Sequence, residues 1–489
     1  QDSADALTEP ATFFSPDKRM PGRPGLELIL LLQYVAWGED AAAYHLFSGL
    51  LHLIAALVLS RAGRAMGLDL IPAMLAGLLF LVNVSHFNAV HWISAQCYPL
   101  VLICGSLALI AYSCKRPFLV YILLLLGILC HISAAAFWPL LVYLARRQND
   151  RVALRRYLPL GLLLGLSILA IKFSYPRAPQ TTIIASSFDP AGALQNLLVN
   201  WSRLFSTAHW LPHNLYEYQT WELFLGAFGF FAFVLSQWRF RFSLNLSQAW
   251  IFVHLLPQML LSPAYIWTIS SGPSRYLYVA AAGSSILLAL GLDWIRRRVH
   301  VYAAAALLLT ILVSSYHSLN RVQSMTIYTA GRHYTASGDL ETGIALLQRA
   351  IDHAPGIIDT HDAYYRICNL QISLGRDFTQ MLLKARTLFP NDDNFAAMHY
   401  VMESLSPNQS ASDKAFSRLD NVFNATREIA VGENRILRSV IATAYYNAAL
   451  GLSKHGQYSR AIDSVQHALA WETNKKEAKE LLNTLKKND

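Results

Sequence analysis

Four histidines have the residue type and the spacing for metal chemistry. His45 and His52 lie seven residues apart, so they share one face if the segment is helical. His86 and His91 follow the next apolar run. Imidazole nitrogens are good ligands for a divalent cation. The four histidines have no tight ligand spacing and no acidic residue beside them, so structural hydrogen bonding is the favoured interpretation and a divalent cation is the alternative.

A second candidate for chemistry is the pair Arg275 and Tyr276, which stands at the start of a long apolar run. The run ends in three consecutive arginines, Arg296, Arg297 and Arg298. A guanidinium at the edge of such a run either extends to the water boundary, makes a structural salt bridge or binds an anion through its planar fork. The choice depends on which elements hold Arg275 and on which side of a membrane it lies.

The composition places most of the chain in a membrane. Of 489 residues, 54% are hydrophobic and only 15% are charged, against about 25% charged in a soluble domain. The net charge of +9 does not indicate nucleic acid, because the basic residues before about residue 321 gather in short loops between apolar runs. We therefore expect no nucleic-acid partner. The five cysteines show neither a disulfide framework nor a CxxC metal spacing.

Ten apolar runs are long enough to be read as membrane-spanning segments. The 30 or so residues between Lys115-Arg116 and Arg146-Arg147 carry basic residues at both ends, which favours a short hairpin that turns near "CHISAAA" over a single span. The runs cover about 45–62, 70–85, 97–114, 118–130, 133–145, 157–173, 221–237, 250–265, 276–293 and 300–317.

The distribution of basic residues predicts the orientation of these segments. One set of loops holds fourteen lysines and arginines, including Arg296, Arg297 and Arg298, and the other set holds eight, including Arg275. The richer set is cytoplasmic by the positive-inside rule, so Arg275 is expected on the outer side. Ten crossings that end outside also begin outside, so we expect a further membrane helix before Gln1.

The regions outside the runs divide into three parts. Residues 1–43 form an external loop in which "RPGLELILLLQYVAWGED" is expected to lie as a helix in the membrane interface. Residues 174–220 form an external loop rich in aromatic residues, which serves as a boundary anchor or as a sugar or lipid platform, with the anchor favoured. The transmembrane domain itself is expected to cover residues 44–318, with about ten helices.

Residues 320–489 have the pattern of tetratricopeptide repeats. Small residues, a turn glycine and a closing proline recur at the repeat's spacing, and stacked helix pairs of this kind share one core. The segment would lie outside the cytoplasm, as a stabilising cap or as a groove that binds a protein or peptide. The key positions are Gly331, Tyr334, Gly338, Gly343, Leu347, Ala350 and Pro355 in the first unit and Ala449, Gly456, Tyr458, Ala461 and Ala468 in the last.

Several segments together resemble a known family. The chain is similar to polytopic glycosyltransferases of the GT-C fold, above all to tetratricopeptide-bearing, O-mannosyltransferase-like membrane proteins. The resemblance covers nearly the whole chain and rests on the order and spacing of weak motifs. The matching residues are Arg23, Pro24, Gly38, Tyr44, His45, Leu46, Leu51 and His52, then Phe80, His86, Val90, Trp92, Ile93 and Ser94, and finally "RYLY" at 275–278.

The resemblance implies an all-α fold, with a GT-C-like transmembrane bundle followed by an extracytoplasmic repeat solenoid. It also implies transfer of a sugar from a polyprenyl-phosphate donor to an acceptor on the outer face. Asp2 and Asp5 lie in the first outer loop, where the family has its acidic motif, so the resemblance implies that they are the candidate catalytic bases. The substrate-binding candidates are Arg23, Tyr44, His45, His86, Arg275 and Tyr278.

The chain also departs from the family at positions expected near one outer cavity. Three positions that are commonly acidic in the family are neutral here, which indicates either a changed substrate or lost catalysis. The departing residues are Asn83 and Val84, Asn88, Ile132 and Ser133, and Ser274. Two hypotheses therefore stand. The first is a glycosyltransferase-like protein of a bacterial inner membrane with its repeats in the periplasm, and the second is a non-catalytic assembly subunit whose repeats bind a partner protein.

Overall fold

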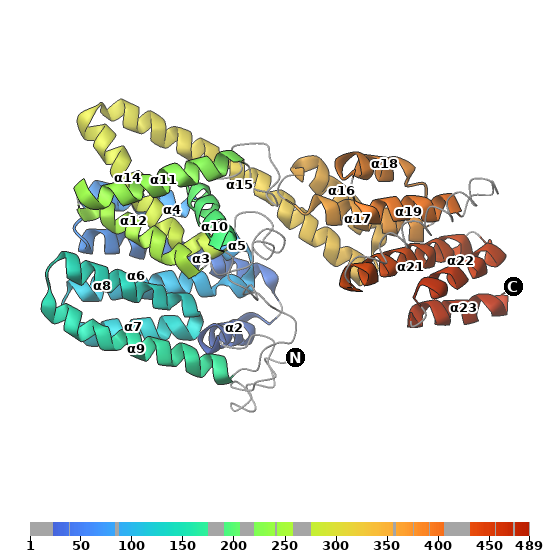
Figure 1. Ribbon diagram of the computed structural model, residues 1–489, viewed down its shortest axis with the longest axis horizontal. Helices are drawn as coiled ribbons and strands as arrows, with labels where there is room; N and C mark the ends of the chain where they lie inside the picture. The colour runs from blue at the N-terminus through green and yellow to red at the C-terminus, as the bar shows by residue number, and fades with distance from the viewer. Residues whose placement is uncertain are drawn as a thin grey trace. The chain divides into compact units, whose positions relative to one another are not determined.

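The chain forms an all-helical structure in every part that can be described (Figure 1). This computed structural model describes residues 23–38, 40–83, 88–174, 190–205, 220–239, 242–257, 275–355, 358–374, 376–390, 392–404, 431–454, 456–472 and 475–488. Within those ranges there is no β-strand. Asp2, Asp5 and His86 lie outside the described residues, as does most of the external loop expected at 174–220. The chain divides into two compact units, residues 1–321 and 322–489, which are treated separately below.

In the first unit, a helix overlaps each of the ten apolar runs. The elements are α2 (Pro24–Trp37), α3 (Ala41–Ala65), α4 (Leu70–Leu81), α5 (Asn88–His91), η3 (Ile93–Ala95), α6 (Cys97–Ser113), α7 (Pro117–Cys130), η4 (Ile132–Ala136), α8 (Phe137–Arg147), α9 (Arg151–Ser174), α10 (Pro190–Arg203), α11 (Thr220–Arg239), α12 (Phe242–Leu255), η6 (Arg275–Leu277), α14 (Tyr278–Arg298) and the first part of α15 (Val301–Ser337).

Five helices in the described residues are long and apolar enough to cross a membrane. They cover Ala41–Ala65, Ile93–Ser113, Arg151–Ala170, Arg275–Arg298 and Val301–Ser337. Large apolar side chains on these helices face outward, for example Leu46, Leu162 and Leu309, which are 61% to 76% exposed. Such exposure would be unfavourable in water, at about 25 cal/mol per Å² of apolar surface. The helices therefore present the apolar surface that a bilayer solvates.

The core of this unit is built around α14, which packs against α4 and α12. Gly283 makes the contact with α12 possible, because a Cβ atom at this position would lie 2.8 Å from the Ser247 carbonyl oxygen. The indole N–H of Trp250 donates to the Val279 carbonyl 2.8 Å away. Small residues at helix contacts are typical of membrane bundles, where close backbone approach replaces the hydrophobic effect as the main source of packing energy.

The stretch between the basic residues at 115–116 and 146–147, where the charges predict a hairpin, folds into two helices, α7 and α8, which are joined by η4. The hydroxyl of Tyr112, near the end of α6, donates to Gln148 Oε1 just beyond α8, over 2.9 Å. Between the two helices lies η4, which the His131 side chain caps by accepting at Nδ1 from the backbone N–H of Ser133 over 3.1 Å. Both ends of the hairpin therefore lie at one end of the bundle.

Two of the three arginines that close α14 are held by carboxylates. Arg296 and Arg297 both pair with Asp293, about one turn earlier on the same helix, at 2.7 and 2.8 Å. Arg297 also reaches Asp69, the residue before α4, at 2.5 Å. These pairs join the ends of two packed helices, which explains how a cluster of three cations is accommodated there.

The second unit consists of helices that pack on their neighbours in sequence. They are the end of α15, α16 (Leu340–His353), α17 (Thr360–Ser373), α18 (Thr379–Leu388), α19 (Asp393–Ser404), α21 (Val431–Lys454), α22 (Tyr458–Trp471) and α23 (Lys476–Asn488). Leu347 and Ala350, two of the expected repeat positions, are fully buried. A Cβ atom on Gly331 would lie 3.0 Å from the Leu347 backbone nitrogen, so the small residue permits the close helix pairing of a tetratricopeptide-like unit. Residues 405–430 lie outside the described ranges.

Candidate anion-binding site at Arg23 and Arg275

Arg275 opens η6, directly before α14, and two aromatic rings hold its guanidinium. The guanidinium carbon lies 4.5 Å from the centre of the Trp92 ring and 4.7 Å from that of Tyr276. Its Nη2 donates to the Tyr276 hydroxyl over 3.0 Å. Each cation–π contact contributes about 0.5–1 kcal/mol or more when it is desolvated. Arg275 is therefore fixed in a half-buried position against the bundle rather than extended away from it.

Arg23 precedes α2 and reaches the start of α6. Its Nη1 donates to Cys97 Sγ at 3.8 Å. Arg23 and Arg275, which are far apart in sequence, act electrostatically on the same three side chains, Cys97, Tyr98 and His131. The fold thus brings together two of the residues that the sequence nominates for substrate binding, and it surrounds one small region with two permanent positive charges.

Tyr98 supplies an uncharged donor within this region. Its side chain is 2% exposed, and its hydroxyl has no hydrogen-bond partner in the described part of the chain. The ring lies 4.9 Å from the ring of His131 and 6.2 Å from that of Tyr276, measured between centroids. A buried hydroxyl without a partner costs about 1–3 kcal/mol, so an unsatisfied phenol beside two arginines is a feature that a bound anion would relieve.

His131 supplies a second uncharged donor. Because the backbone N–H of Ser133 donates to Nδ1 at 3.1 Å, Nδ1 acts as an acceptor and the proton of the neutral ring is assigned to Nε2. The Nε2–H group is then available to a ligand. Sequence reasoning noticed this histidine only as part of a turn and did not single out Tyr98. The usable signal was that both lie at ends of apolar runs that the predicted topology places on the same side as Arg275.

Buried amides attach α2 to the bundle and so position Arg23. Gln33 Nε2 donates to Gln96 Oε1 at 2.7 Å, and Gln96 Nε2 donates back to Gln33 Oε1 at 3.2 Å. Gln96 Nε2 also donates to Ser48 Oγ at 2.8 Å. Both glutamines are nearly inaccessible. Since Gln96 directly precedes Cys97, this network connects α2, α3 and α6 next to the residue that Arg23 contacts.

The other predicted site residues lie apart from the arginine pair or cannot be described. Tyr44 donates from its hydroxyl to the Gly38 carbonyl at 2.8 Å, which closes the turn between α2 and α3. His45 is exposed on α3. Tyr278 is fully buried in the core, where its hydroxyl lies 2.8 Å from His52 Nδ1. His86 and the candidate bases Asp2 and Asp5 fall outside the described residues.

Of the four histidines, His52 makes structural hydrogen bonds in the described residues. His52 Nε2 lies 3.1 Å from the Leu81 carbonyl oxygen, which accepts but cannot donate, so Nε2 carries the proton and Nδ1 accepts from Tyr278. Over the ranges that the structure describes, no three His, Cys, Asp or Glu side chains are grouped to hold a metal ion.

Comparison with known proteins adds little to this description. No protein-family model and no curated protein matches the chain. Among solved structures, the chain is similar to the tetratricopeptide domain of P58(IPK), at 12% sequence identity, with 79% of this chain and 97% of that chain covered and a TM-score of 0.15. That score does not establish a shared fold. The chain is defined by its own geometry as an all-helical protein with a bundle of membrane-type helices and a unit of paired helices.

Proposed function

We propose that this protein is a glycosyltransferase-like integral membrane protein that binds a polyprenyl-phosphate-linked sugar at the outer end of its bundle. The observation that carries the proposal is that Arg23 contacts Cys97, next to the buried Tyr98, and that Arg275 donates to Tyr276, whose ring centroid lies 6.2 Å from that of Tyr98. This arrangement suits a phosphate whose lipid tail remains in the bilayer. The protein would belong to a bacterial inner membrane, with the paired-helix unit on the periplasmic side.

Two guanidinium groups suit a phosphate, because its oxygens match the planar fork of an arginine. An arginine fork donates two parallel hydrogen bonds to phosphate oxygens, and charge-assisted bonds of this kind are about twice as strong as neutral ones. During transfer, the acceptor hydroxyl oxygen forms a bond to the anomeric carbon and the bond from that carbon to the phosphate oxygen breaks. Negative charge then grows on the departing polyprenyl phosphate, where fixed cations stabilise the transition state.

The acceptor proton needs a carboxylate to receive it. Asp2 and Asp5 remain the candidates that the family resemblance implies. The structure adds Glu27, which lies one turn after Arg23 on α2 and has both carboxylate oxygens buried. A partly dry carboxylate next to the phosphate site is suited to general-base catalysis. All three residues therefore belong in a test of the activity.

The alternative function is that of a non-catalytic assembly subunit, with the paired helices binding a partner protein. One local observation favours it. The position where the family commonly carries a Lys-Glu pair is occupied here by Ile132 and Ser133. The backbone N–H of Ser133 donates to His131 Nδ1, and the Ser133 hydroxyl oxygen lies 2.8 Å from the same nitrogen. That position completes a structural turn here, which is what a protein that no longer needs the catalytic acid would retain.

A transfer assay in nanodiscs separates these functions. The donors are radiolabelled polyprenyl-phosphate sugars, and extracted membrane protein is the acceptor pool. Under the proposed function, Arg275→Gln lowers the transfer rate about a hundredfold, because it removes a donor to the developing charge. Arg298→Gln, an exposed arginine at the other end of α14, is the matched control and leaves the rate unchanged.

Carboxylate variants decide which residue receives the proton. Asp2→Asn with Asp5→Asn is compared with Glu27→Gln in the same assay. Loss of transfer in one set and not the other assigns the base. The enzymatic proposal would be contradicted if no donor supports transfer in a preparation that retains a stoichiometric protein partner. That result would favour the assembly subunit.

A further inference from the structure

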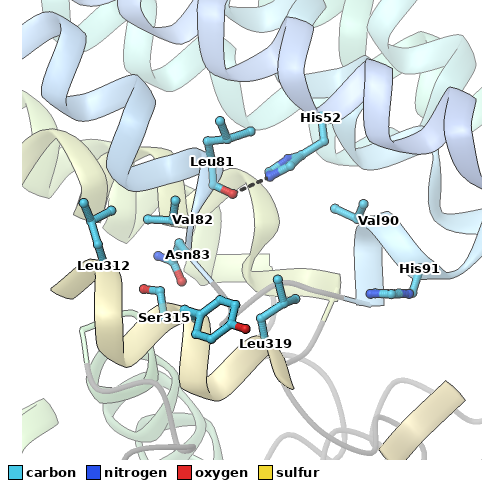
Figure 2. Close-up of a pocket in the computed structure, with 10 residues that line it drawn as sticks. His52, Leu81, Val82, Asn83, Val90, His91, Leu312, Ser315 and Leu319 are labelled. Atoms are coloured by element: carbon cyan, nitrogen blue, oxygen red, sulfur yellow. Dashed lines mark hydrogen bonds between the residues drawn. The ribbon is translucent and has the colours of Figure 1, made fainter. Parts of the chain in front are cut away.

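A separate cavity lies between the end of α4, the short helix α5 and the middle of α15 (Figure 2). Its volume is about 330 Å³, at the small end of the range for sites that bind small molecules, roughly 300–1,000 Å³. All the residues that line it belong to the first unit. It is distinct from the arginine pair, neither of whose members lines it.

The polar groups of the cavity are uncharged hydrogen-bonding side chains. Asn83, His91, Ser315 and Tyr316 line it together with apolar residues such as Leu312. Figure 2 shows Asn83 and Ser315 on one side of the cavity and His91 on the other. Among the described residues that line the cavity there is no Lys, Arg, Asp or Glu. The described lining therefore contains an amide, hydroxyls and an imidazole, and none of its residues carries a fixed charge.

His52 forms part of the wall but is already fully bonded. Its two ring nitrogens are engaged by Tyr278 and by the Leu81 carbonyl oxygen, at 2.8 and 3.1 Å. In the neutral ring, Nε2 donates to the Leu81 carbonyl oxygen and Nδ1 accepts from the Tyr278 hydroxyl. The cavity therefore keeps an uncharged wall on the side of α3 as well.

The rim of the cavity lies on surface that faces outward from α15. Tyr316 is 76% exposed and Leu319 is 51% exposed, on a helix that is long and apolar enough to cross a membrane. Ser315, one residue from Tyr316, is only 7% exposed and points into the wall. A ligand with an apolar part would cover this rim, while its other part would meet the hydrogen-bonding groups of the lining.

We propose that this cavity binds the head of an uncharged, hydroxyl-bearing membrane lipid, such as a monoacylglycerol, whose chain lies along α15. Hydroxyl groups of the head would pair with Asn83, Ser315 and His91, and the chain would cover Leu312 and Leu319. A charged head is disfavoured, because burying an ion without a counter-charge costs far more than burying a hydroxyl that finds a partner. The inference does not depend on the proposed function.

Photolabelling of the full-length protein in phosphatidylcholine nanodiscs tests this. The probe is a monoacylglycerol with a photoreactive group in its acyl chain, and labelled peptides are identified by mass spectrometry. We expect the label in peptides that contain residues 312–319 or 81–91. We expect unlabelled monoacylglycerol to abolish labelling and the same chain with a phosphate head to have no effect. Equal competition by the two compounds would overturn the proposal.

Matched variants locate the ligand. Ser315→Leu fills the polar end of the cavity and is expected to reduce labelling about tenfold or more, since the leucine occupies the space of the head. Ser314→Leu makes the same change one position earlier, which points about 100° away around the helix, and is expected to label normally. If Ser315→Leu does not fold, Leu312→Phe replaces it. Unchanged labelling in the cavity variant, or equal loss in the control, would contradict the site.

The two proposals fail separately. If the protein transfers sugar but monoacylglycerol does not compete for photolabelling, the proposed arginine site stands and the proposed lipid cavity is refuted. If the protein is photolabelled as expected but does not bind polyprenyl phosphate, the lipid cavity stands and the arginine site is refuted.

Discussion

At the scale of single residues, the Tyr98 hydroxyl is the most informative group in the first unit. It is buried without a partner in the described residues and lies in the field of two arginines. In the absence of ligand, such a hydroxyl destabilises the fold. With an anion bound between the arginines, the same hydroxyl donates a hydrogen bond. Its effects on stability and on binding are therefore expected to have opposite signs.

Tyr98→Phe tests this directly. The variant is expected to unfold at the same temperature as the parent or higher, because it removes a buried unsatisfied group. Its affinity for polyprenyl phosphate is expected to fall about tenfold or more, since a hydrogen bond to a charged group contributes about 1.5–3 kcal/mol. Tyr112→Phe is the control, because the Tyr112 hydroxyl donates to Gln148 within the chain. That variant should lose stability and keep its affinity.

A second prediction at this scale concerns the pair His361 and Asp392 in the paired-helix unit. The Nε2 of His361 lies 2.7 Å from Asp392 Oδ2, and its ring packs on Phe389 and Phe395. The hydrogen bond to Asp392 raises the pKa of His361, with burial opposing it. Burial acts to raise the pKa of Asp392, but the hydrogen bonds from His361 and from the Phe395 backbone lower it overall.

The signs of these shifts define a pH window. The raised pKa of His361 gives stability that is complete below 6.5 and is lost as pH rises through the folded-state pKa. The lowered pKa of Asp392 gives stability that is present above 3.8 and is lost at lower pH. We expect His361→Gln to speed hydrogen exchange in α17 and α19 by up to about fivefold near pH 5.5, a contribution of up to about 1 kcal/mol for a partly exposed pair.

Hydrogen exchange of the full chain at two pH values, corrected for the intrinsic rate, measures this window. The difference between the parent and His361→Gln should shrink above pH 8. His333→Gln, at an exposed position of the same unit, should show no difference at either pH. An effect of His361→Gln that is as large at pH 8.5 as at pH 5.5 would mean that packing on the phenylalanines, and not the ion pair, stabilises this region.

At the scale of elements, α2 depends on two glutamines that the sequence did not mark as important. Gln33 and Gln96 are buried, and the amide nitrogen of each donates to the amide oxygen of the other. Gln96→Leu leaves the Gln33 amide without its partner, which costs about 1–3 kcal/mol. Replacing both by leucine removes both polar groups, and such a paired change is close to neutral. The single variant is therefore expected to loosen α2 and the double variant to restore it.

Hydrogen exchange of the peptide that covers α2 (Pro24–Trp37) distinguishes these outcomes. We expect faster exchange in Gln96→Leu, by about fivefold to a hundredfold for the cost given above, and nearly parental exchange in the double variant. Equal exchange in the two variants would show that α2 is held by its apolar contacts alone and that the amide network does not position Arg23.

Elements were easier to predict than contacts. The division of residues 117–147 into two helices agrees with the basic residues at both ends of this apolar stretch, which are a local sequence feature. The burial of Leu347 and Ala350 followed from repeat spacing, which reports nearest-neighbour packing. The meeting of Tyr98, His131 and the two arginines could not be predicted, because it depends on how four separate elements pack, and no local pattern records that.

At the scale of the whole molecule, the chain combines two units with different surfaces. The first exposes large apolar side chains on helices long enough to cross a bilayer, and the second buries small residues between paired helices. The sequence predicted this division from composition, because the change from apolar runs to repeat spacing occurs near residue 320. The sidedness of the two units and the identity of any partner stay predictions.

The central claim is that Arg23 and Arg275 bind one phosphate together. The most direct measurement is the affinity of the nanodisc-embedded protein for polyprenyl phosphate in a double-mutant cycle of Arg23→Gln and Arg275→Gln. If both guanidiniums contact one phosphate, each single variant loses about tenfold or more, and the two losses are non-additive by about 0.5–3 kcal/mol. Losses that add independently, or affinities that match the Arg298→Gln control, would contradict the shared site.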